Sequence, residues 1–132
     1  MIGVMDVSGT MEILMQKEKA EEFSRIIQES SFIMAPDLYI SELSNSLWKY
    51  YTMKIYTKEI CHEYIRDGID FIDKFISSQE IWEEAFAEGI KNNHSIYDML
   101  YMVTARRYDA VLITNDSVLK GISKKNHIQV CN

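Results

Sequence analysis

Two aspartates lie where carboxylates could do chemistry together. Asp6 directly follows an apolar run at residues 2–5, and Asp116 follows the strongest β-branched run, residues 110–114. Both runs are typical of strands. Functional sites in open α/β sheets form beyond the carboxyl ends of the strands. If the two strands are neighbours, we expect both carboxylates to emerge into one crevice.

The same two residues have a purely local explanation. Asp6 fits an Asx turn, and Asp116 fits the N-cap of a helix. Aspartate is favoured at both positions because its side chain accepts a hydrogen bond from a free backbone N–H. Both interpretations stay open at this point.

Asp98 is a third candidate, in the motif Ser95-Ile96-Tyr97-Asp98. The motif fits a capping box with Ser95 as the N-cap. Asp98 also shares a helical stripe with Met102 and Ala105, and packing of that stripe would draw the carboxylate inward. A buried carboxylate needs a positive partner, which a metal ion would supply.

Glu42 is the acid that local structure explains least. It lies in the middle of a predicted helix, beyond capping range, with Asn45 and Lys49 further along its stripe. A solvated helix face is the alternative. Carboxylate-rich sites suit Mg²⁺ or Mn²⁺, which prefer oxygen ligands to histidine or cysteine.

The elements that must position these acids alternate along the chain. We predict strands at residues 2–5, 32–35, 110–114 and 128–130. We predict helices at residues 18–28, 36–53, 57–75, 80–91, 95–107 and 117–125, with Pro36 in the first turn of the second. Such alternation favours a three-layer α/β/α domain around a central, mostly parallel sheet.

Composition limits the class of protein. The 132 residues suit a single domain, residues 1–132, and 47% hydrophobic residues with five Gly and one Pro indicate a folded globular chain. A net charge of −6 argues against bulk electrostatic binding of DNA or membranes. Cys61 and Cys131 have no metal-binding spacing, and we expect both to be structural in a reducing cytoplasm. No leader or membrane span is predicted.

The ordered motifs carry a family resemblance. They are Asp6-Val7-Ser8, Pro36 with Glu42 and Asn45, Ser95-x-x-Asp98, and Thr114-Asn115-Asp116. In this order and spacing, over essentially the whole chain, they resemble the PIN-domain ribonucleases. The closest likeness is to the VapC-type toxins of toxin–antitoxin pairs.

The resemblance implies a site and an activity. The acidic, metal-binding and catalytic quartet would be Asp6, Glu42, Asp98 and Asp116, and the polar supports would be Ser8, Asn45, Thr114 and Asn115. One or two Mg²⁺ or Mn²⁺ ions would assist hydrolysis of RNA, leaving a 5′-phosphate and a 3′-hydroxyl. The resemblance also implies a cognate antitoxin and a homodimer. The chain departs from the usual pattern at Gly9-Thr10-Met11 and at Asn115, which bears on substrate choice.

Other side chains are candidates for binding. The cations that could hold phosphates are Arg106, Arg107, Lys120, Lys124 and Lys125, with solvated helix ends as the alternative. His94 is the histidine nearest an acidic motif, where a loop or cap role is the alternative to catalysis. An aromatic cluster of core or partner-binding residues comprises Tyr39, Trp48, Tyr50, Tyr51 and Tyr56.

Three other functions compete with the toxin hypothesis. One is an RNA-processing PIN nuclease without an antitoxin, and another is a non-catalytic interaction module. The third is a receiver-like signalling domain, which needs a lysine after a late strand. The predicted late strand instead ends in Thr114-Asn115-Asp116, which disfavours the receiver.

Overall fold

The strands form one parallel sheet at the centre of the molecule, in the order β3-β2-β1-β4. This is a computed structural model, and it describes residues 1–131. The strands are β1 (Ile2–Met5), β2 (Phe32–Pro36), β3 (Lys74–Ile76) and β4 (Val111–Ile113). The helices are α1 (Val7–Leu14), α2 (Ala20–Glu29), α3 (Leu38–Thr52), α4 (Lys58–Asp70), α5 (Ser78–Asn92), α6 (Ile96–Arg107) and α7 (Ser117–Lys125).

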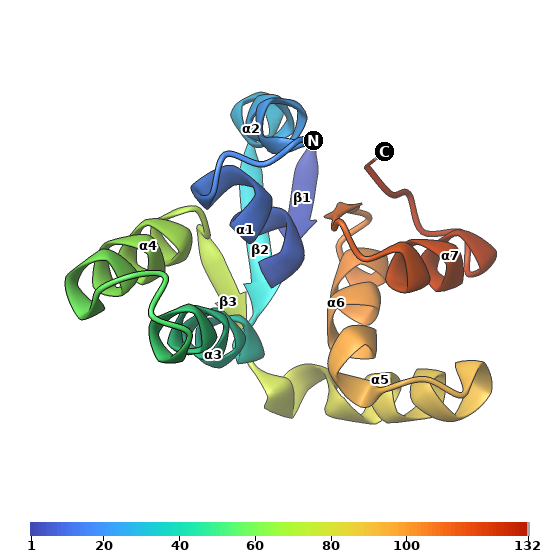
Figure 1. Ribbon diagram of the computed structural model, residues 1–132. Coiled ribbons are helices and arrows are strands. Elements are labelled where there is room, and N and C mark those ends of the chain that lie inside the picture. Colours follow the sequence, from blue (N-terminus) through green and yellow to red (C-terminus); the bar gives the residue numbers. More distant parts are fainter. Residues whose placement is uncertain (132) are drawn as a thin grey trace.

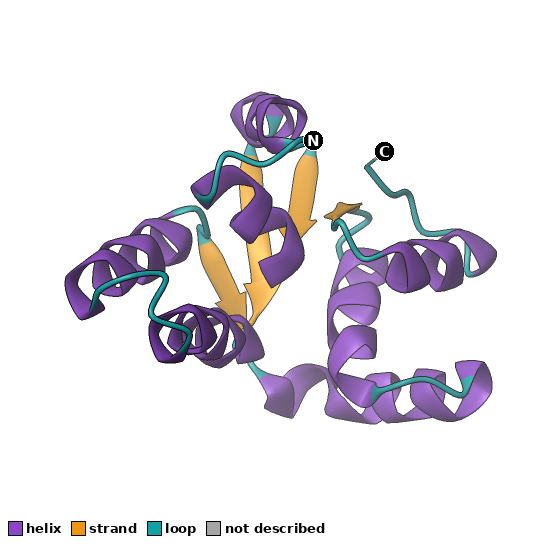
Figure 2. Cartoon of the chain, viewed as in Figure 1, coloured by secondary structure: helices purple, strands orange, loops and turns teal. Residues whose placement is uncertain are grey.

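Helices cover both faces of the sheet. α6 packs against β1, β2 and β4 and is itself flanked by α5 and α7, whereas α1 packs on α2, α3 and α4. Figure 1 shows α1 in front of β1 and β2, α3 and α4 beside β3, and α6 with α7 at the opposite edge of the sheet, and Figure 2 shows the same arrangement by type of element. The predicted three-layer α/β/α architecture is therefore confirmed, and the sheet is parallel throughout the described chain.

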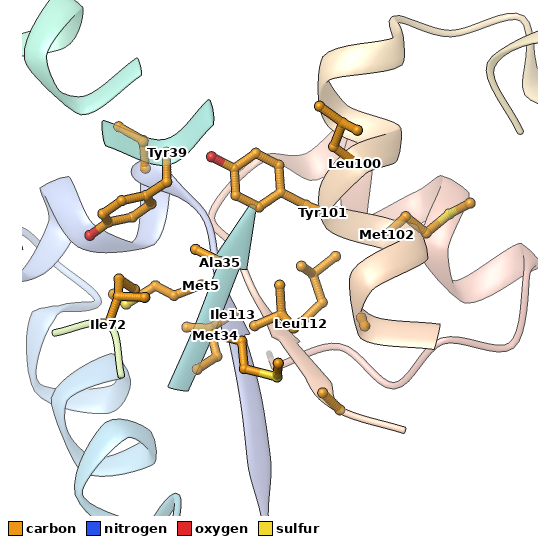
Figure 3. Packing of buried hydrophobic residues seen from close by; sticks show 14 of the residues in the cluster. Met5, Met34, Ala35, Tyr39, Ile72, Leu100, Tyr101, Met102, Leu112 and Ile113 are labelled. Atoms are coloured by element: carbon orange, nitrogen blue, oxygen red, sulfur yellow. The ribbon is translucent and has the colours of Figure 1, made fainter. Parts of the chain in front are cut away.

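Burial on both faces explains the composition of the strands. Val4, Met5, Leu112 and Ile113 are fully buried, as expected for parallel strands that are covered by helices on each side. Figure 3 shows Met5 extending toward Ile72 and Leu112 lying toward Met102 of α6, so the strands bury side chains on both faces of the sheet. The core therefore lies directly behind the carboxyl ends of β1 and β4.

The helix predicted over residues 57–75 is wrong at its end. α4 stops at Asp70, and Lys74–Ile76 instead forms β3 at the edge of the sheet, paired with Met34–Pro36. Asp73 fixes this pairing, because its backbone N–H donates to Ile33 O and its carboxylate accepts from Ile33 N, both at 2.8 Å. A three-residue strand carries no periodicity of its own, so long-range pairing decides its conformation.

Two further predictions need correction. Pro36 is the last residue of β2, opposite Ile76, and α3 begins at Leu38 rather than at Pro36. Residues 128–130 form no regular strand, since only Val130 makes an isolated parallel bridge to Leu112. Within residues 1–131, no helix is both long and apolar enough to cross a membrane.

Candidate active site

The sheet order places two of the predicted acids side by side. β2 and β3 extend from one edge of β1, whereas β4 pairs with its other edge, so strand order reverses between β1 and β4. Asp6 follows β1 and Asp116 follows β4. The expectation that these strands are neighbours is confirmed, and both aspartates lie at the switch point where ligands bind in open α/β sheets.

Asp6 is a buried carboxylate held by its neighbours. Oδ1 accepts hydrogen bonds from the Ser8 hydroxyl at 2.7 Å and from the Gly9 N–H at 2.9 Å, and Oδ2 accepts one from the Thr114 hydroxyl. Asp6 is thus the N-cap of α1 as well as a candidate site residue, so its two interpretations are compatible. A Cβ at Gly9 would lie 3.0 Å from Ile113 O, which explains the small residue there.

Burial changes the acidity of Asp6. Desolvation raises the pKa of Asp6 to about 6, the nearby Asp116 carboxylate raises it further, and the hydrogen bonds from Thr114, Gly9 and Ser8 oppose the rise. The charged form of Asp6 is therefore costly without a cation beside it.

Asp116 is oriented by its helix. One carboxylate oxygen, Oδ1, accepts from Val118 N at 2.9 Å and from Leu119 N at 3.1 Å, so the predicted N-cap role is confirmed. The Asp116 N–H donates to the Thr114 hydroxyl at 3.0 Å, which in turn donates to Asp6. This chain of hydrogen bonds couples the two aspartates.

The predicted polar supports differ in the hydrogen bonds that they form. The Ser8 hydroxyl lies 3.1 Å from the Thr114 hydroxyl and accepts from Asn115 N at 2.8 Å, so it joins the loops after β1 and β4. The Asn115 amide donates to Glu12 at 2.7 Å. Asn45 is exposed on α3, and its side chain forms no hydrogen bond within residues 1–131.

Glu42 faces the second half of the site from α3. Its Oε1 accepts a hydrogen bond of 2.5 Å from the buried hydroxyl of Tyr101 on α6. Desolvation raises the pKa of Glu42, the Tyr101 hydrogen bond opposes that rise, and the Asp98 carboxylate adds to it. The solvated helix face considered for Glu42 does not describe this half-buried, partnered carboxylate.

Asp98 lies in the first turn of α6, whose N-cap is Ser95 as predicted. Its stripe-mates Met102 and Ala105 are buried, and Asp98 itself is partly buried. The group that meets it is His94, whose Nε2 lies 2.6 Å from Asp98 Oδ2. His94 therefore contacts one of the predicted site residues directly.

The four acids interact as two pairs in the structure, Asp6 with Asp116 and Glu42 with Asp98. Tyr101 links the pairs, because both Glu42 and Asp6 raise the pKa of its buried phenol. We call Asp6, Glu42, Asp98 and Asp116 the acidic site. Across the described residues, neither lysine nor arginine forms an ion pair with any of its members.

The donor set of the acidic site fits Mg²⁺ or Mn²⁺. All four members offer carboxylate oxygens, and the buried Asp6 and the partly buried Asp116 repel each other with no basic counter-ion in the described chain. In residues 1–131, no three carboxylate, imidazole or thiol side chains lie close enough to enclose an ion directly. An ion at the acidic site would therefore have to keep several of its waters and bind through one or two carboxylates, as Mg²⁺ can.

The predicted phosphate-binding cations divide into two groups. Arg106 pairs with Glu84 at 2.7 Å and Glu88 at 2.9 Å, and Arg107 pairs with Glu84 at 3.2 Å, so both arginines brace α6 against α5. Lys120 lies one helical turn after Asp116, and burial together with the neighbouring Lys19 ammonium lowers the pKa of Lys120. The Glu22 carboxylate opposes this lowering of the Lys120 pKa.

The members of the aromatic cluster predicted along α3 differ in how far they are exposed. Tyr39 is completely buried and belongs to the core, one of the two roles expected for the cluster. Tyr50, Tyr56 and Tyr64 stack in sequence with centroids 5.5 and 5.3 Å apart. Trp48 and Tyr51 are more than half exposed.

Two contributors to the site were missed in the sequence. Tyr101 was not singled out, although its position one turn after Asp98 places it on the same side of α6. Glu12 is buried and accepts hydrogen bonds from the Asn115 side chain and from Lys19 N. The available signal for Glu12 in the sequence was its position between the apolar residues Met11 and Ile13.

Comparison with known proteins identifies a family and a relative that match most of the chain. The family model described as PIN domain matches residues 4–125. Ribonuclease VapC3 of Pyrobaculum aerophilum is 25% identical over 118 residues, which cover 88% of this chain and 90% of that protein.

Two solved structures share the fold. The crystal structure of PAE2754 from Pyrobaculum aerophilum matches with a TM-score of 0.76 and 17% identity, over 94% of this chain and 89% of that one. VapBC2 from Rickettsia felis, bound to a DNA fragment from their promoter, matches with a TM-score of 0.68 and 15% identity, over 98% and 97% of the two chains.

Proposed function

The chain belongs to the PIN domain family, and on this premise we propose that it is a metal-dependent endoribonuclease and the toxin of a toxin–antitoxin pair. The observation that carries the proposal is the buried, uncompensated carboxylate of Asp6 beside Asp116 at the switch point of the sheet. The similarity to Ribonuclease VapC3 supports RNA as the substrate. The family match also removes the receiver-like alternative.

The acidic site would hold one or two Mg²⁺ or Mn²⁺ ions through Asp6, Glu42, Asp98 and Asp116. A bound divalent ion supplies a water of lowered pKa and neutralises charge on the phosphodiester during in-line displacement. Because the pKa of Asp6 is about 6 in the metal-free chain, ion binding must compete with a proton there.

The chain's own residues orient these carboxylates. Ser8, Thr114 and the Gly9 N–H fix Asp6, and the first turn of α7 fixes Asp116. The remaining acceptor positions of each carboxylate are free for an ion. Lys19 and Lys120, near the α7 end of the site, provide positive charge for the RNA backbone.

An antitoxin is the partner that this proposal requires. The solved VapBC2 complex supports such a pairing, and the charge of −6 favours a basic partner. We expect an arginine of the antitoxin to enter the acidic site, since a guanidinium pairs bidentately with carboxylates and displaces the metal.

The apolar part of the antitoxin surface would lie at the end of α3. Trp48, Tyr51, Met53 and Ile55 are all at least half exposed, and a cavity of about 400 Å³ is lined by Tyr51, Ile55 and Tyr56 among others. Trp48 lies six residues after Glu42, about 9 Å along the helix axis. Six residues also turn the two side chains about 120° apart around the helix, so a partner that covers both features would have to wrap around α3.

The proposed homodimer has separate support on α5. Trp82, Phe86 and Ile90 are exposed at intervals of four residues and so form one apolar stripe. A self-complementary contact about a two-fold axis would bury this stripe against its own copy.

A cleavage assay tests the proposed activity. The purified chain should cut RNA with Mg²⁺ or Mn²⁺, stop in EDTA and resume when the metal is restored. Co-purification with the product of an adjacent reading frame should abolish cleavage. Cleavage without any such inhibitory partner would leave the RNA-processing alternative in its place.

A further inference from the structure

Tyr101 is a polar group in an apolar position. It lies on α6 with only 1% of its surface exposed, among the largest fully buried side chains. Figure 3 shows its ring extending from α6 toward the helix that carries Tyr39. A buried hydroxyl must find a hydrogen-bond partner, so the one that it finds is informative.

The partner of Tyr101 is a member of the acidic site. Its hydroxyl donates to Glu42 Oε1 at 2.5 Å, across 59 residues of sequence. Burial and the adjacent Glu42 charge raise the pKa of Tyr101 far above its ordinary value, so the phenol keeps its proton and acts as a donor. A hydrogen bond to a charged acceptor is shorter and stronger than a neutral one.

Glu42 depends on this contact for a defined position. Its side chain has three rotatable bonds and lies on a half-buried helix face. Among the described residues, Tyr101 is its one side-chain hydrogen-bond partner. Fixing a flexible carboxylate before an ion arrives lowers the ordering cost of binding.

We propose that Tyr101 is a positioning residue, which holds Oε1 of Glu42 and leaves Oε2 to face a divalent cation in the acidic site. This inference rests on the proposed function, since it assigns a residue that orients one of the proposed metal ligands. Residues that hydrogen-bond to metal ligands orient them, and their loss lowers metal affinity about 10- to 100-fold.

Tyr39 provides a matched control. It is another completely buried tyrosine with a hydrogen-bonded hydroxyl, which lies 2.7 Å from the Thr10 hydroxyl and donates to Gly68 O at 2.7 Å. Tyr39→Phe therefore removes a comparable buried hydroxyl without touching a carboxylate of the acidic site.

The test measures Mn²⁺ binding to the metal-free chain by titration calorimetry. Tyr101→Phe should weaken Mn²⁺ binding about 10-fold, whereas Tyr39→Phe should leave it unchanged. In the Glu42→Gln background, adding Tyr101→Phe should cost nothing further, because the hydroxyl acts through the Glu42 carboxylate. Metal-free thermal unfolding of each variant checks that the fold is retained.

Two results would overturn the proposal: wild-type Mn²⁺ affinity in Tyr101→Phe, or an equal loss with and without Glu42. If Tyr101→Phe does not fold, the ¹³Cζ resonance of Tyr101 in the wild-type chain should shift on addition of Mg²⁺ and stay fixed in Glu42→Gln. An identical response in both chains would equally refute it. A wild-type chain that binds no Mn²⁺ and cuts no RNA would instead refute the proposed function.

Discussion

The carboxylate of Asp6, at the end of β1, accepts a hydrogen bond from the hydroxyl of Thr114, 108 residues later at the end of β4. The same hydroxyl accepts from the Asp116 N–H at 3.0 Å. One threonine therefore connects two acids of the proposed metal site across the switch point of the sheet.

Asp6→Asn should reduce RNA cleavage at least about 100-fold. The variant would bind the metal ion poorly, and without the ion's charge the activation free energy rises by several kcal/mol. The change is nearly isosteric and relieves repulsion with Asp116, so the variant should fold. Single-turnover cleavage with Mg²⁺ measures the effect.

Asp37→Asn is the matched control for that experiment. Asp37 also follows a strand, β2, but it is exposed and binds Ser78 rather than another acid. Its cleavage rate should equal that of the wild type. Comparable losses in both variants would contradict the assignment of Asp6.

The metal-free chain should lose stability as the pH rises through the titration of Asp6. The folded-state pKa of about 6 exceeds the ordinary value of 3.8, so the native state binds the proton more tightly than the unfolded state. This group's contribution to the free energy of unfolding therefore falls by about 3 kcal/mol in all between about pH 3 and pH 7, with most of the fall between the two pKa values, and stays low above that range.

Urea unfolding in EDTA at pH 4.5 and pH 7 measures this linkage. The pH-dependent fall should be smaller in Asp6→Asn than in the wild type, because the variant has no titrating group at that position. Carboxylates that do not interact with Asp6 contribute equally to both chains and cancel in the difference. An unchanged pH dependence in Asp6→Asn would show that Asp6 titrates normally.

Mg²⁺ should stabilise the wild-type chain at pH 7.5. A ligand present at 100 times its dissociation constant adds about 2.7 kcal/mol to the free energy of unfolding. Thermal unfolding with and without Mg²⁺ should show this shift in the wild type and in Asp37→Asn, but not in Asp116→Asn. A shift retained in Asp116→Asn would place the ion elsewhere.

Trp48→Ala should weaken antitoxin binding while RNA cleavage by the free chain stays intact. Trp48 is 58% exposed near the end of α3 and is remote from catalysis in this proposal. A tryptophan at the centre of an interface costs about 2 kcal/mol or more when truncated, or roughly a thirtyfold loss of affinity. Calorimetry with the purified antitoxin measures this loss.

Trp82→Ala provides the comparison, because Trp82 is 55% exposed on α5, away from α3. It should leave antitoxin affinity unchanged and shift the oligomeric state toward monomer in sedimentation velocity. Equal losses of antitoxin affinity in the two variants would mean that the binding surface is not confined to the end of α3.

Much of the fold could be predicted from local signals. The strand at residues 2–5 and the helix at residues 117–125 have the predicted bounds, since β-branched runs and capping residues act over a few neighbours. β3 was missed because Lys74–Ile76 is too short to show a pattern and gains its conformation from pairing with β2. Pro36 was misplaced because proline suits a strand end as well as a first helical turn.

In the candidate site, too, some features follow from local sequence and others from long-range packing. The sequence by itself determined which acids follow strands or begin helices, because those positions depend on residue type and on nearby spacing. Only the tertiary structure decided that Tyr101 reaches Glu42, that His94 meets Asp98, and that Arg106 is engaged by Glu84 and Glu88. These contacts join different helices, or form only when a loop side chain folds back onto its helix. They depend on how α3, α5 and α6 pack around the sheet, and no local propensity encodes that packing.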